Sequence, residues 1–216
     1  MIAVVAVTGA FLANRYGHLP ELLPVHFGPR GFADGWEFKT PARVLMPVLV
    51  QLTLMITLGG IGGLLLARSD RGIALNAPDV KAVTTAAEAV MLIAVIWIAF
   101  QAYAAFAIVY MWTTARAGLG PVYTTLELLG AVLSAVVGAR AVRRLGRPEP
   151  LVYVAGHWRL GQLYCNAKDP SLFVPTRDGS RWTLNFGRPA AVTFLAVILA
   201  TGIALPTIIL MLALRS

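Results

Sequence analysis

Long apolar stretches separated by shorter polar segments dominate the pattern of this 216-residue chain. Four stretches reach the roughly 20 mainly apolar residues that a helix needs to cross a bilayer. They are residues 44–67, 83–112, 121–142 and 189–214. A fifth stretch, residues 1–13, is shorter, and it has neither a basic start nor a small-residue cleavage site, so we read it as a retained first helix. The pattern predicts an all-α integral membrane protein with about five transmembrane helices.

Composition supports lipid as the solvent for most of the chain. Hydrophobic residues make up 58% and charged residues 13%, with a mean hydropathy of +0.74, whereas about a quarter of an average soluble domain is charged. The net charge of +8 raises nucleic acid as a partner. In so apolar a chain, however, basic residues are more typical of topology signals and of contacts with anionic lipid headgroups. We therefore expect membrane lipids, and no nucleic acid, as partners.

The distribution of Lys and Arg predicts the orientation, because positively charged short loops stay in the cytoplasm. With five spans, the second and fourth connections share one side and carry three and nine basic residues. The other side carries four in the first connection, one in the third and one in the tail. We expect a multi-pass membrane protein with its amino terminus in the cytoplasm and its carboxyl terminus outside.

Four parts follow from this arrangement. Residues 1–67 contain the first two spans and an outer loop, and residues 68–139 contain the third and fourth spans. Residues 140–188 form a basic cytoplasmic segment, and residues 189–216 form the final span.

The outer loop, residues 15–43, is longer than a connection requires, which is typical of functional loops. Its prolines fix the backbone and its glycines permit tight bends, so we expect an ordered loop. Rigid loops with aromatic anchors suit recognition of a partner. The candidate partner-binding residues here are Pro20, Pro24, His26, Phe27 and Trp36.

The cytoplasmic segment opens with a basic run that we assign to anionic lipid headgroups. Its members are Arg140, Arg143, Arg144 and Arg147. Farther on, Asp178 and Gly179 separate two strand-like runs, a pattern that predicts a small β-hairpin with a type I′ turn. Phe173 and Trp182, one on each run, are further candidates for contact with a partner.

Two residue patterns resemble known families. The first resembles the LPxxxPxHF signature of an amino-terminal domain of unknown function in SdpI-like bacterial membrane proteins, which include bacteriocin-immunity proteins. It is carried by Leu19, Pro20, Pro24, His26, Phe27, Gly31, Gly35 and Trp36. The second resembles another uncharacterised domain, with a DPxxFVP and WTLNF pattern. It is carried by Tyr164, Asn166, Asp169, Pro170, Phe173, Val174, Pro175, Arg177, Gly179, Trp182, Thr183, Leu184, Asn185 and Phe186, with departures at Cys165, Ala167, Lys168 and Arg181.

Catalytic and metal-binding motifs are missing from the sequence. Its three histidines lack metal-ligand spacing, and no nucleophile elbow, phosphate-binding loop or His-Glu-x-x-His motif occurs. We expect no enzyme activity and no cofactor. Glu88 and Glu127 lie near span ends, where each side chain can reach water, although a proton or ion pathway is the alternative.

Small and polar residues within the spans are typical of helix packing. Gly59 and Gly63 have the spacing that lets two helices approach closely, within the chain or between subunits. Gln51 and Gln101 lie deeper in their spans, where an amide needs a hydrogen-bonding partner on a neighbouring helix.

The resemblance implies a non-enzymatic inner-membrane protein of SdpI-like immunity or signalling type, with a protein partner in or at the membrane. The alternative is an accessory structural subunit that stabilises a larger membrane complex. A small transporter is less favoured, because no pair of broken or repeated spans with midplane charges occurs.

Overall fold

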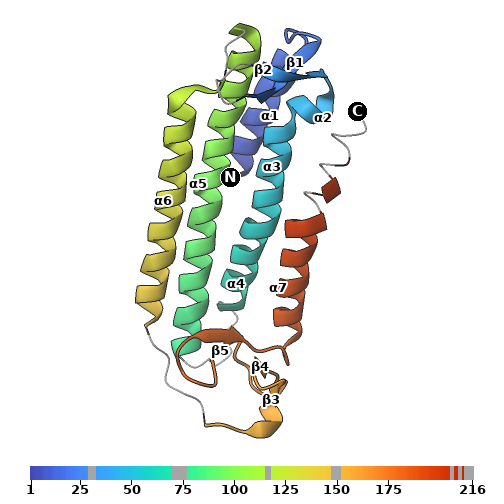
Figure 1. The fold of residues 1–216 in the computed structure, drawn as a ribbon. Coiled ribbons are helices and arrows are strands. Elements are labelled where there is room, and N and C mark those ends of the chain that lie inside the picture. The colour runs from blue at the N-terminus through green and yellow to red at the C-terminus, as the bar shows by residue number, and fades with distance from the viewer. Residues whose placement is uncertain are drawn as a thin grey trace.

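A computed structural model describes residues 1–28, 33–69, 77–114, 118–146, 152–204, 207–208 and 211. The described part is mostly helical, with the helices along one bundle and short strands gathered at its two ends (Figure 1). The main helices are α1 (Ile2–Tyr16), α3 (Met46–Leu54), α4 (Gly60–Ser69), α5 (Ala77–Thr114), α6 (Gly120–Leu145) and α7 (Pro189–Leu199).

Three helical stretches of the described chain are long and apolar enough to cross a membrane. They are Met46–Gly63, Val80–Thr114 and Gly120–Leu145. The shorter apolar helices α1 and α7 begin within the two remaining stretches for which the sequence predicts spans. The helical, membrane-protein character is thus supported by three candidate spans rather than five.

Two of the apolar stretches are not uniform α-helices. The π-helical segment η1 (Met55–Gly59) joins α3 to α4, and a second one, η3 (Ala200–Ala204), follows α7. π-Helical turns are rare and usually short insertions within α-helices. The two segments contact each other, so the irregular turns of these helices lie together.

Helix α5 is the spine of the molecule. Its 38 residues make it about 57 Å long at 1.5 Å per residue, which exceeds the roughly 30 Å hydrocarbon core of a bilayer. It contacts α1, α3, α4 and α6 along its length. Helix α5 is therefore long enough to extend beyond the hydrocarbon core, where its ends can support the polar segments.

A separate hydrophobic cluster lies near each end of α5. The first comprises Leu12, Leu19, Leu23, Val44, Ala105, Val109, Met111 and Trp112. The second comprises Ile61, Leu65, Val83, Ala87, Leu172 and Ala191. Each cluster includes residues from outside the long helices, so each end of the bundle is closed by a folded polar segment.

The amino hairpin closes one end (Figure 1). It consists of the antiparallel strands β1 (Leu22–Phe27) and β2 (Ala33–Phe38), followed by the short helix α2 (Pro41–Val44). The sequence predicts an ordered loop here but no strands, because prolines weaken a strand signal. A two-stranded ribbon tolerates Pro24, and the register shifts between Pro24 and His26 as at a β-bulge.

The carboxyl lobe, residues 152–188, closes the opposite end. It contains η2 (Ala155–His157), two-residue strands β3 (Trp158–Arg159) and β4 (Leu163–Tyr164), and the antiparallel pair β5 (Phe173–Pro175) and β6 (Trp182–Leu184). The β5–β6 pair confirms the predicted hairpin. The two polar segments that the sequence assigns to opposite membrane faces thus lie at opposite ends of the bundle.

The predicted type I′ turn at Asp178 and Gly179 is wrong. Gly179 has a φ of +65°, but Leu160 is the one non-glycine residue of the described chain with a positive φ, so Asp178 does not adopt the required conformation. The loop is longer instead, because Thr176 N–H donates to the Arg181 carbonyl and Gly179 N–H donates to the Thr176 carbonyl. The Asp178 carboxylate stabilises this longer loop by accepting hydrogen bonds from the Thr176 hydroxyl and from the amide and hydroxyl of Ser180.

Paired positive φ angles occur instead between β3 and β4. Leu160 has a φ of +51° and Gly161 a φ of +73°, and Gln162 N–H donates to the Arg159 carbonyl at 3.2 Å. Two positive φ values within such a hydrogen-bonded turn are the mark of type I′ geometry. The sequence does not predict this turn, because a leucine is at its first central position and non-glycine residues other than Asn and Asp rarely adopt a positive φ.

Candidate functional site

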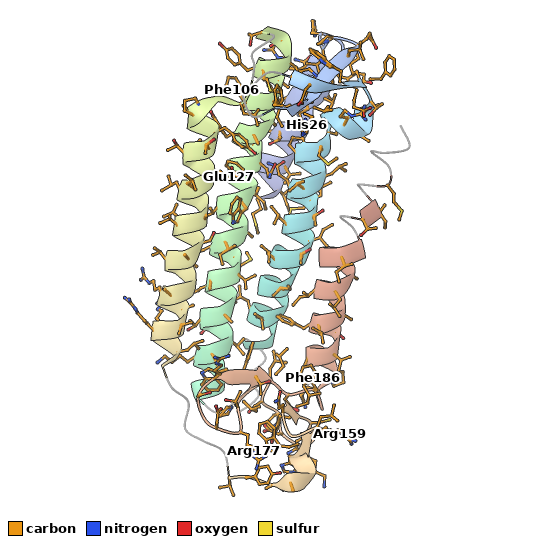
Figure 2. All side chains as sticks on the ribbon, in the orientation of Figure 1. His26, Phe106, Glu127, Arg159, Arg177 and Phe186 are labelled. Atoms are coloured by element: carbon orange, nitrogen blue, oxygen red, sulfur yellow. The ribbon has the colours of Figure 1, made fainter. Side chains whose placement is uncertain are left out.

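The polar groups of the molecule gather at the two ends of the bundle. Figure 2 shows His26 on the amino hairpin and, at the other end, Arg159, Arg177 and Phe186 on the carboxyl lobe. The predicted partner-binding residues therefore do not form one site. Those of the first loop lie at one end, and Phe173 and Trp182 lie at the other.

A buried hydrogen bond anchors the amino hairpin to α5. Trp112, near the end of α5, donates from Nε1 to the Pro24 carbonyl at 3.0 Å. Both residues are buried, and Leu23 beside Pro24 is fully enclosed in the first hydrophobic cluster. Because a buried carbonyl without a partner is costly, this bond holds β1 against the bundle.

Two basic side chains brace the hairpin where β2 ends. Lys39 donates from Nζ to the Leu19 carbonyl at 3.1 Å and to Glu21 Oε1 at 2.9 Å. Its ammonium group also lies 5.2 Å from the centre of the Tyr16 ring, an arrangement that suits a cation–π contact. Lys39 therefore ties the end of β2 to the segment that precedes β1.

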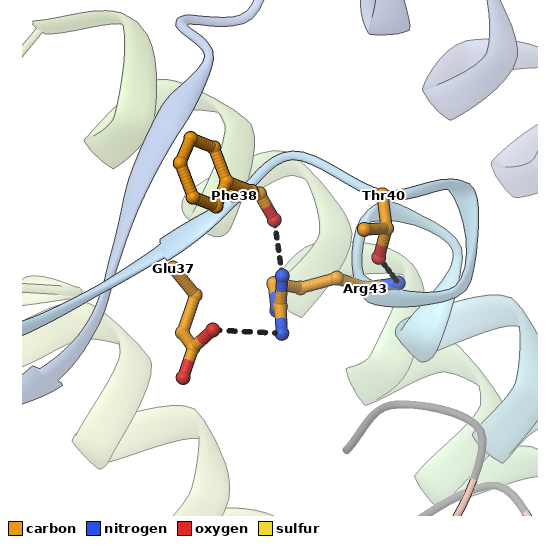
Figure 3. Close-up of polar contacts among 4 residues, drawn as sticks. All are labelled: Glu37, Phe38, Thr40 and Arg43. Carbon is orange, nitrogen blue, oxygen red and sulfur yellow. Dashed lines mark hydrogen bonds and ion pairs between the residues drawn. The ribbon is translucent and has the colours of Figure 1, made fainter. Parts of the chain in front are cut away.

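Arg43 makes the second brace (Figure 3). Its guanidinium donates to the Phe38 carbonyl and, at 3.3 Å, to Glu37 Oε2. Thr40 caps α2 by accepting a hydrogen bond from the Arg43 amide at 3.3 Å. The backbone amide of Arg43 thus takes part in the cap of α2, and its side chain holds the last two residues of β2.

The outer face of this braced hairpin is apolar. Trp36 is 57% exposed and Phe38 is 67% exposed, and Phe38 pairs across the ribbon with Leu22, which is also exposed. Side chains two apart on a strand, and directly opposite on its partner, share a face. Leu22, Trp36 and Phe38 therefore form one exposed surface, which we call the aromatic face.

The other sequence candidates in this loop occupy different positions. Phe27 is partly buried and packs against the first hydrophobic cluster, and Pro24 is buried. Pro20 is exposed, as is His26, whose Nδ1 is hydrogen-bonded to the Asp34 carboxylate. Of the predicted aromatic anchors, Trp36 alone is open to a partner, while Phe27 supports the hairpin from inside.

A fully buried asparagine organises the carboxyl lobe. Asn185 Oδ1 accepts from the amides of Asn166 and Gly187, both at 3.0 Å. Its Nδ2 donates to the carbonyls of Asn166, Asp169 and Ser171 at 2.9 to 3.2 Å. One side chain thereby links the segment after β4 to the end of β6.

Close packing beside this asparagine excludes any side chain at Gly187. A Cβ placed there would lie 2.5 Å from the backbone of Asn166, a distance that requires the backbone to move. Nearby, burial raises the pKa of the Tyr164 hydroxyl, and Asp169, which accepts its hydrogen bond at 2.9 Å, raises that pKa further. The asparagines and glycine of this pattern have a structural role.

A polar cleft of about 740 Å³ lies between the β3–β4 pair and the loop after β5. Arg177, Asp178 and Arg181 line it. Hydrogen bonds from Ser180 and Thr176 hold the pKa of the exposed Asp178 carboxyl well below its usual range. The cleft thus presents two guanidinium groups and one carboxylate that stays ionised.

The two predicted aromatic candidates of the lobe are turned toward the protein. Phe173 packs against the second hydrophobic cluster together with Leu184, its partner across the hairpin. Trp182 is partly buried, and its Nε1 has no hydrogen-bonding partner among the described residues. The hairpin therefore rests on the bundle through apolar contacts.

The predicted lipid-binding arginines lie at the end of α6. Arg144 forms an ion pair with Glu88 of α5, and both Arg140 and Arg143 are exposed. Arg147 lies outside the described residues. Glu127, the other acidic residue within the spans, is exposed on α6 (Figure 2).

Gln51 is the polar centre of the bundle. It is fully buried and donates from Nε2 to Thr8 Oγ1 on α1 at 3.2 Å and to the Ile98 carbonyl on α5 at 2.9 Å. Its Oε1 has no partner in the described part of the chain. Gln101, one turn farther along α5, is partly buried.

The glycines of the second apolar stretch have unequal surroundings. A Cβ at Gly62 would lie 2.5 Å from Met91 on α5, whereas a Cβ at Gly59 would meet Met1 at 3.4 Å and one at Gly63 would meet nothing within 4 Å. Gly62 thus marks the close approach of α4 to α5. The four-residue spacing in the sequence singles out Gly59 and Gly63 instead, so this spacing does not identify Gly62 as the glycine at the contact.

Sequence reasoning missed the side chains that hold each end in place. Trp112 reads as one more aromatic residue at a span end, and its bond to Pro24 joins positions 88 residues apart. Phe38 lies beside Trp36 but carries no motif. Asn185 is visible only as part of a family pattern, which does not reveal its role.

Comparison with known proteins gives a family match for the amino-terminal part of the chain. Residues 2–50 match a family described as a domain of unknown function (DUF1648), which is often found in membrane proteins. The match covers α1, the amino hairpin, α2 and the first turn of α3. No curated protein and no solved structure matches the chain.

Proposed function

We propose that this protein is a non-enzymatic, multi-pass membrane protein that recognises a protein partner through the aromatic face of its amino hairpin. The observation that carries the proposal is the contrast within the hairpin. Its inner side is held by Trp112, Lys39 and Arg43, while Trp36 and Phe38 remain exposed. A rigid support lowers the entropy lost on binding, and exposed aromatic side chains are the usual anchors of interfaces.

In this proposal the chain crosses the membrane five times, with α1 and the stretch that starts with α7 completing the three longer spans. The amino hairpin faces the outside of a bacterial inner membrane, and the carboxyl lobe faces the cytoplasm. The distribution of basic residues supports this orientation, and the separation of the two segments along the bundle is compatible with it. The cleft at Arg177 and Arg181 then offers a second, cytoplasmic contact surface.

Labelling of single cysteines tests the orientation. Cys165 is first replaced by serine, and cysteines are then introduced for Trp36 and Lys168 in separate proteins. In cells with a permeable outer barrier, an impermeant maleimide should label position 36 and leave position 168 unlabelled until the inner membrane is opened. Labelling of position 168 in sealed cells would reverse the orientation.

Site-specific photocrosslinking tests partner recognition. A photoreactive phenylalanine analogue at position 36 or 38 should give an adduct of discrete protein mass in growing cells. The matched control carries the analogue at position 27, which packs inside the hairpin. Adducts to lipid alone from positions 36 and 38 would refute the protein partner and leave the aromatic face as a headgroup anchor.

The likeness to SdpI-like proteins makes immunity or signalling the proposed biological role. The alternative remains an accessory subunit of a larger complex. Size analysis of the protein extracted in mild detergent separates the two roles. A stoichiometric large complex supports the accessory subunit, whereas a chain that migrates alone and protects cells from a bacteriocin supports immunity.

A further inference from the structure

A groove lies between α5 and α6 at the end of the bundle that carries the carboxyl lobe. Its volume is about 320 Å³. One wall follows the stripe Thr85, Glu88, Ala89 and Leu92 of α5, and the other is formed by Val136, Val137, Arg140, Ala141 and Arg144 of α6. The groove is therefore apolar toward the middle of the bundle and charged toward its end.

Helix α6 leaves this groove open because α5 is its main contact in the described structure. Large apolar side chains, among them Val132 and Val136, are exposed along it. In the membrane arrangement proposed above, this side of α6 faces lipid acyl chains. The charged end of the groove then lies at the level of the headgroups.

The arginines at this end are not fully explained by the structure of α6 itself. The helix ends at Leu145, and cations in the last turn stabilise the negative end of the helix dipole. This interaction with the helix dipole accounts for Arg143 and Arg144, which lie in the last turn. Arg140 lies more than one turn earlier, lines the groove, and has no hydrogen bond or ion pair with another described residue.

The ion pair between Glu88 and Arg144 is weak. The ion pair joins two side chains that are about half exposed, and exposed ion pairs contribute little to stability because water and salt screen them. A phosphate group can replace the carboxylate, since guanidinium groups bind phosphate through paired, charge-assisted hydrogen bonds. Arg140 and Arg144, four residues apart on one helix face, can both reach a single phosphate.

We propose that this groove binds one anionic phospholipid, with the phosphate between Arg140 and Arg144 and an acyl chain along Leu92, Val136 and Val137. The choice of occupant follows from charge complementarity at one end and from apolar walls at the other. The inference rests on membrane insertion as proposed above, but not on recognition of a partner by the amino hairpin.

Native mass spectrometry of the full chain in detergent tests the proposal. With phosphatidylglycerol and phosphatidylcholine at equal concentration, the protein should retain one phosphatidylglycerol with a preference of about tenfold. Both lipids carry the phosphate, but the quaternary ammonium of phosphatidylcholine offsets its negative charge and is repelled by the two guanidinium groups. Arg140→Gln and Arg144→Gln should each lower that occupancy several-fold. Glu88→Gln should raise it, because the competing carboxylate is removed.

Arg143→Gln is the matched control, since it removes the same charge from the same turn but does not line the groove. It should leave occupancy within about twofold of the parent protein. Val137→Trp is a second test that keeps every charge. The larger side chain fills the groove and should displace the lipid. Loss of lipid from this variant would therefore come from the lost space and not from a change in charge.

Four outcomes would overturn the proposal. Equal retention of both lipids would show that the groove does not recognise the headgroup, and an equal loss in Arg143→Gln would reduce the effect to general surface charge. A dimer that excludes lipid from the groove would assign it to a second copy of the chain. Displacement of the bound phosphatidylglycerol by millimolar inorganic phosphate would assign the two arginines to a free-phosphate site instead of a lipid site. Failure of crosslinking at position 36 would leave all these results unchanged.

Discussion

The amino hairpin and the carboxyl lobe both close an end of the bundle, but they turn their large apolar side chains in opposite directions. Each closes one end of the bundle with short antiparallel strands. The hairpin is braced by three side chains and turns Trp36 and Phe38 outward. The lobe turns Phe173 and Leu184 of its β5–β6 hairpin into the bundle and is organised around Asn185. Whether an aromatic residue of these segments can meet a partner or supports the fold therefore depends on the side of the strand on which it lies.

The largest effect is expected from Asn185→Ala in the carboxyl lobe. The substitution removes the side-chain hydrogen bonds to two amides and three carbonyls, at a site where the asparagine is fully buried. We expect a loss of roughly 3 kcal/mol in the stability of the lobe. Limited proteolysis of the purified protein should then cleave within residues 152–188 while the amino hairpin stays protected.

Thr183→Ala on β6 is the control for Asn185→Ala, because it shortens a partly exposed side chain two residues before the asparagine. It should leave cleavage of the lobe nearly unchanged. Equal resistance of the parent protein and Asn185→Ala to protease would contradict the central role of this asparagine.

Trp112→Phe tests the corresponding anchor of the amino hairpin. The ring is kept, but the hydrogen bond to the buried Pro24 carbonyl is lost, which should cost about 1–2 kcal/mol. Hydrogen exchange should become faster for amides of β1 and β2 and stay the same in the lobe. Trp36→Phe, on the exposed face, should change stability by less than about 0.5 kcal/mol. Uniform changes at both ends would show that the two units are not independent.

A gain in stability is expected from Leu160→Asn. Leu160 has a φ of +51° and is 92% exposed, so it loses little burial on replacement. Asn adopts this conformation more easily, and the relief should be about 1 kcal/mol. Val152→Asn is the control, because Val152 is similarly exposed and has no positive φ. Thermal unfolding should rise for the first variant only, and an equal rise in both would point to solubility rather than strain.

The smallest effect concerns acid and the loop after β5. Hydrogen bonds from Ser180 and Thr176 lower the pKa of Asp178 below its ordinary value of 3.8. A carboxyl with a lowered pKa in the folded state stabilises that state above its ordinary pKa, and the contribution is lost as the pH falls toward the lower value. Asp178→Ala should therefore loosen the loop at pH 7, and the difference from the parent protein should vanish in strong acid. Carboxyl NMR shifts that titrate near 3.8 would contradict this prediction.

The sequence by itself determined the elements that depend on local composition. Apolar runs of sufficient length predicted the helices, since hydropathy is a property of neighbouring residues. The two polar segments and the β5–β6 hairpin were also predictable, because prolines, glycines and strand-like runs act locally. The sequence also singled out Trp36, as an aromatic residue in an ordered loop.

Tertiary structure alone decided which side chains meet. Trp112 bonds to Pro24, Arg144 pairs with Glu88 and Gln51 joins three helices, all across separations of more than 40 residues. It also decided that Phe27 faces inward while Trp36 faces outward, and that the type I′ geometry occurs at Leu160 rather than at Asp178. Such contacts depend on helix rotation and strand register, which packing sets over the whole chain and which no local pattern records.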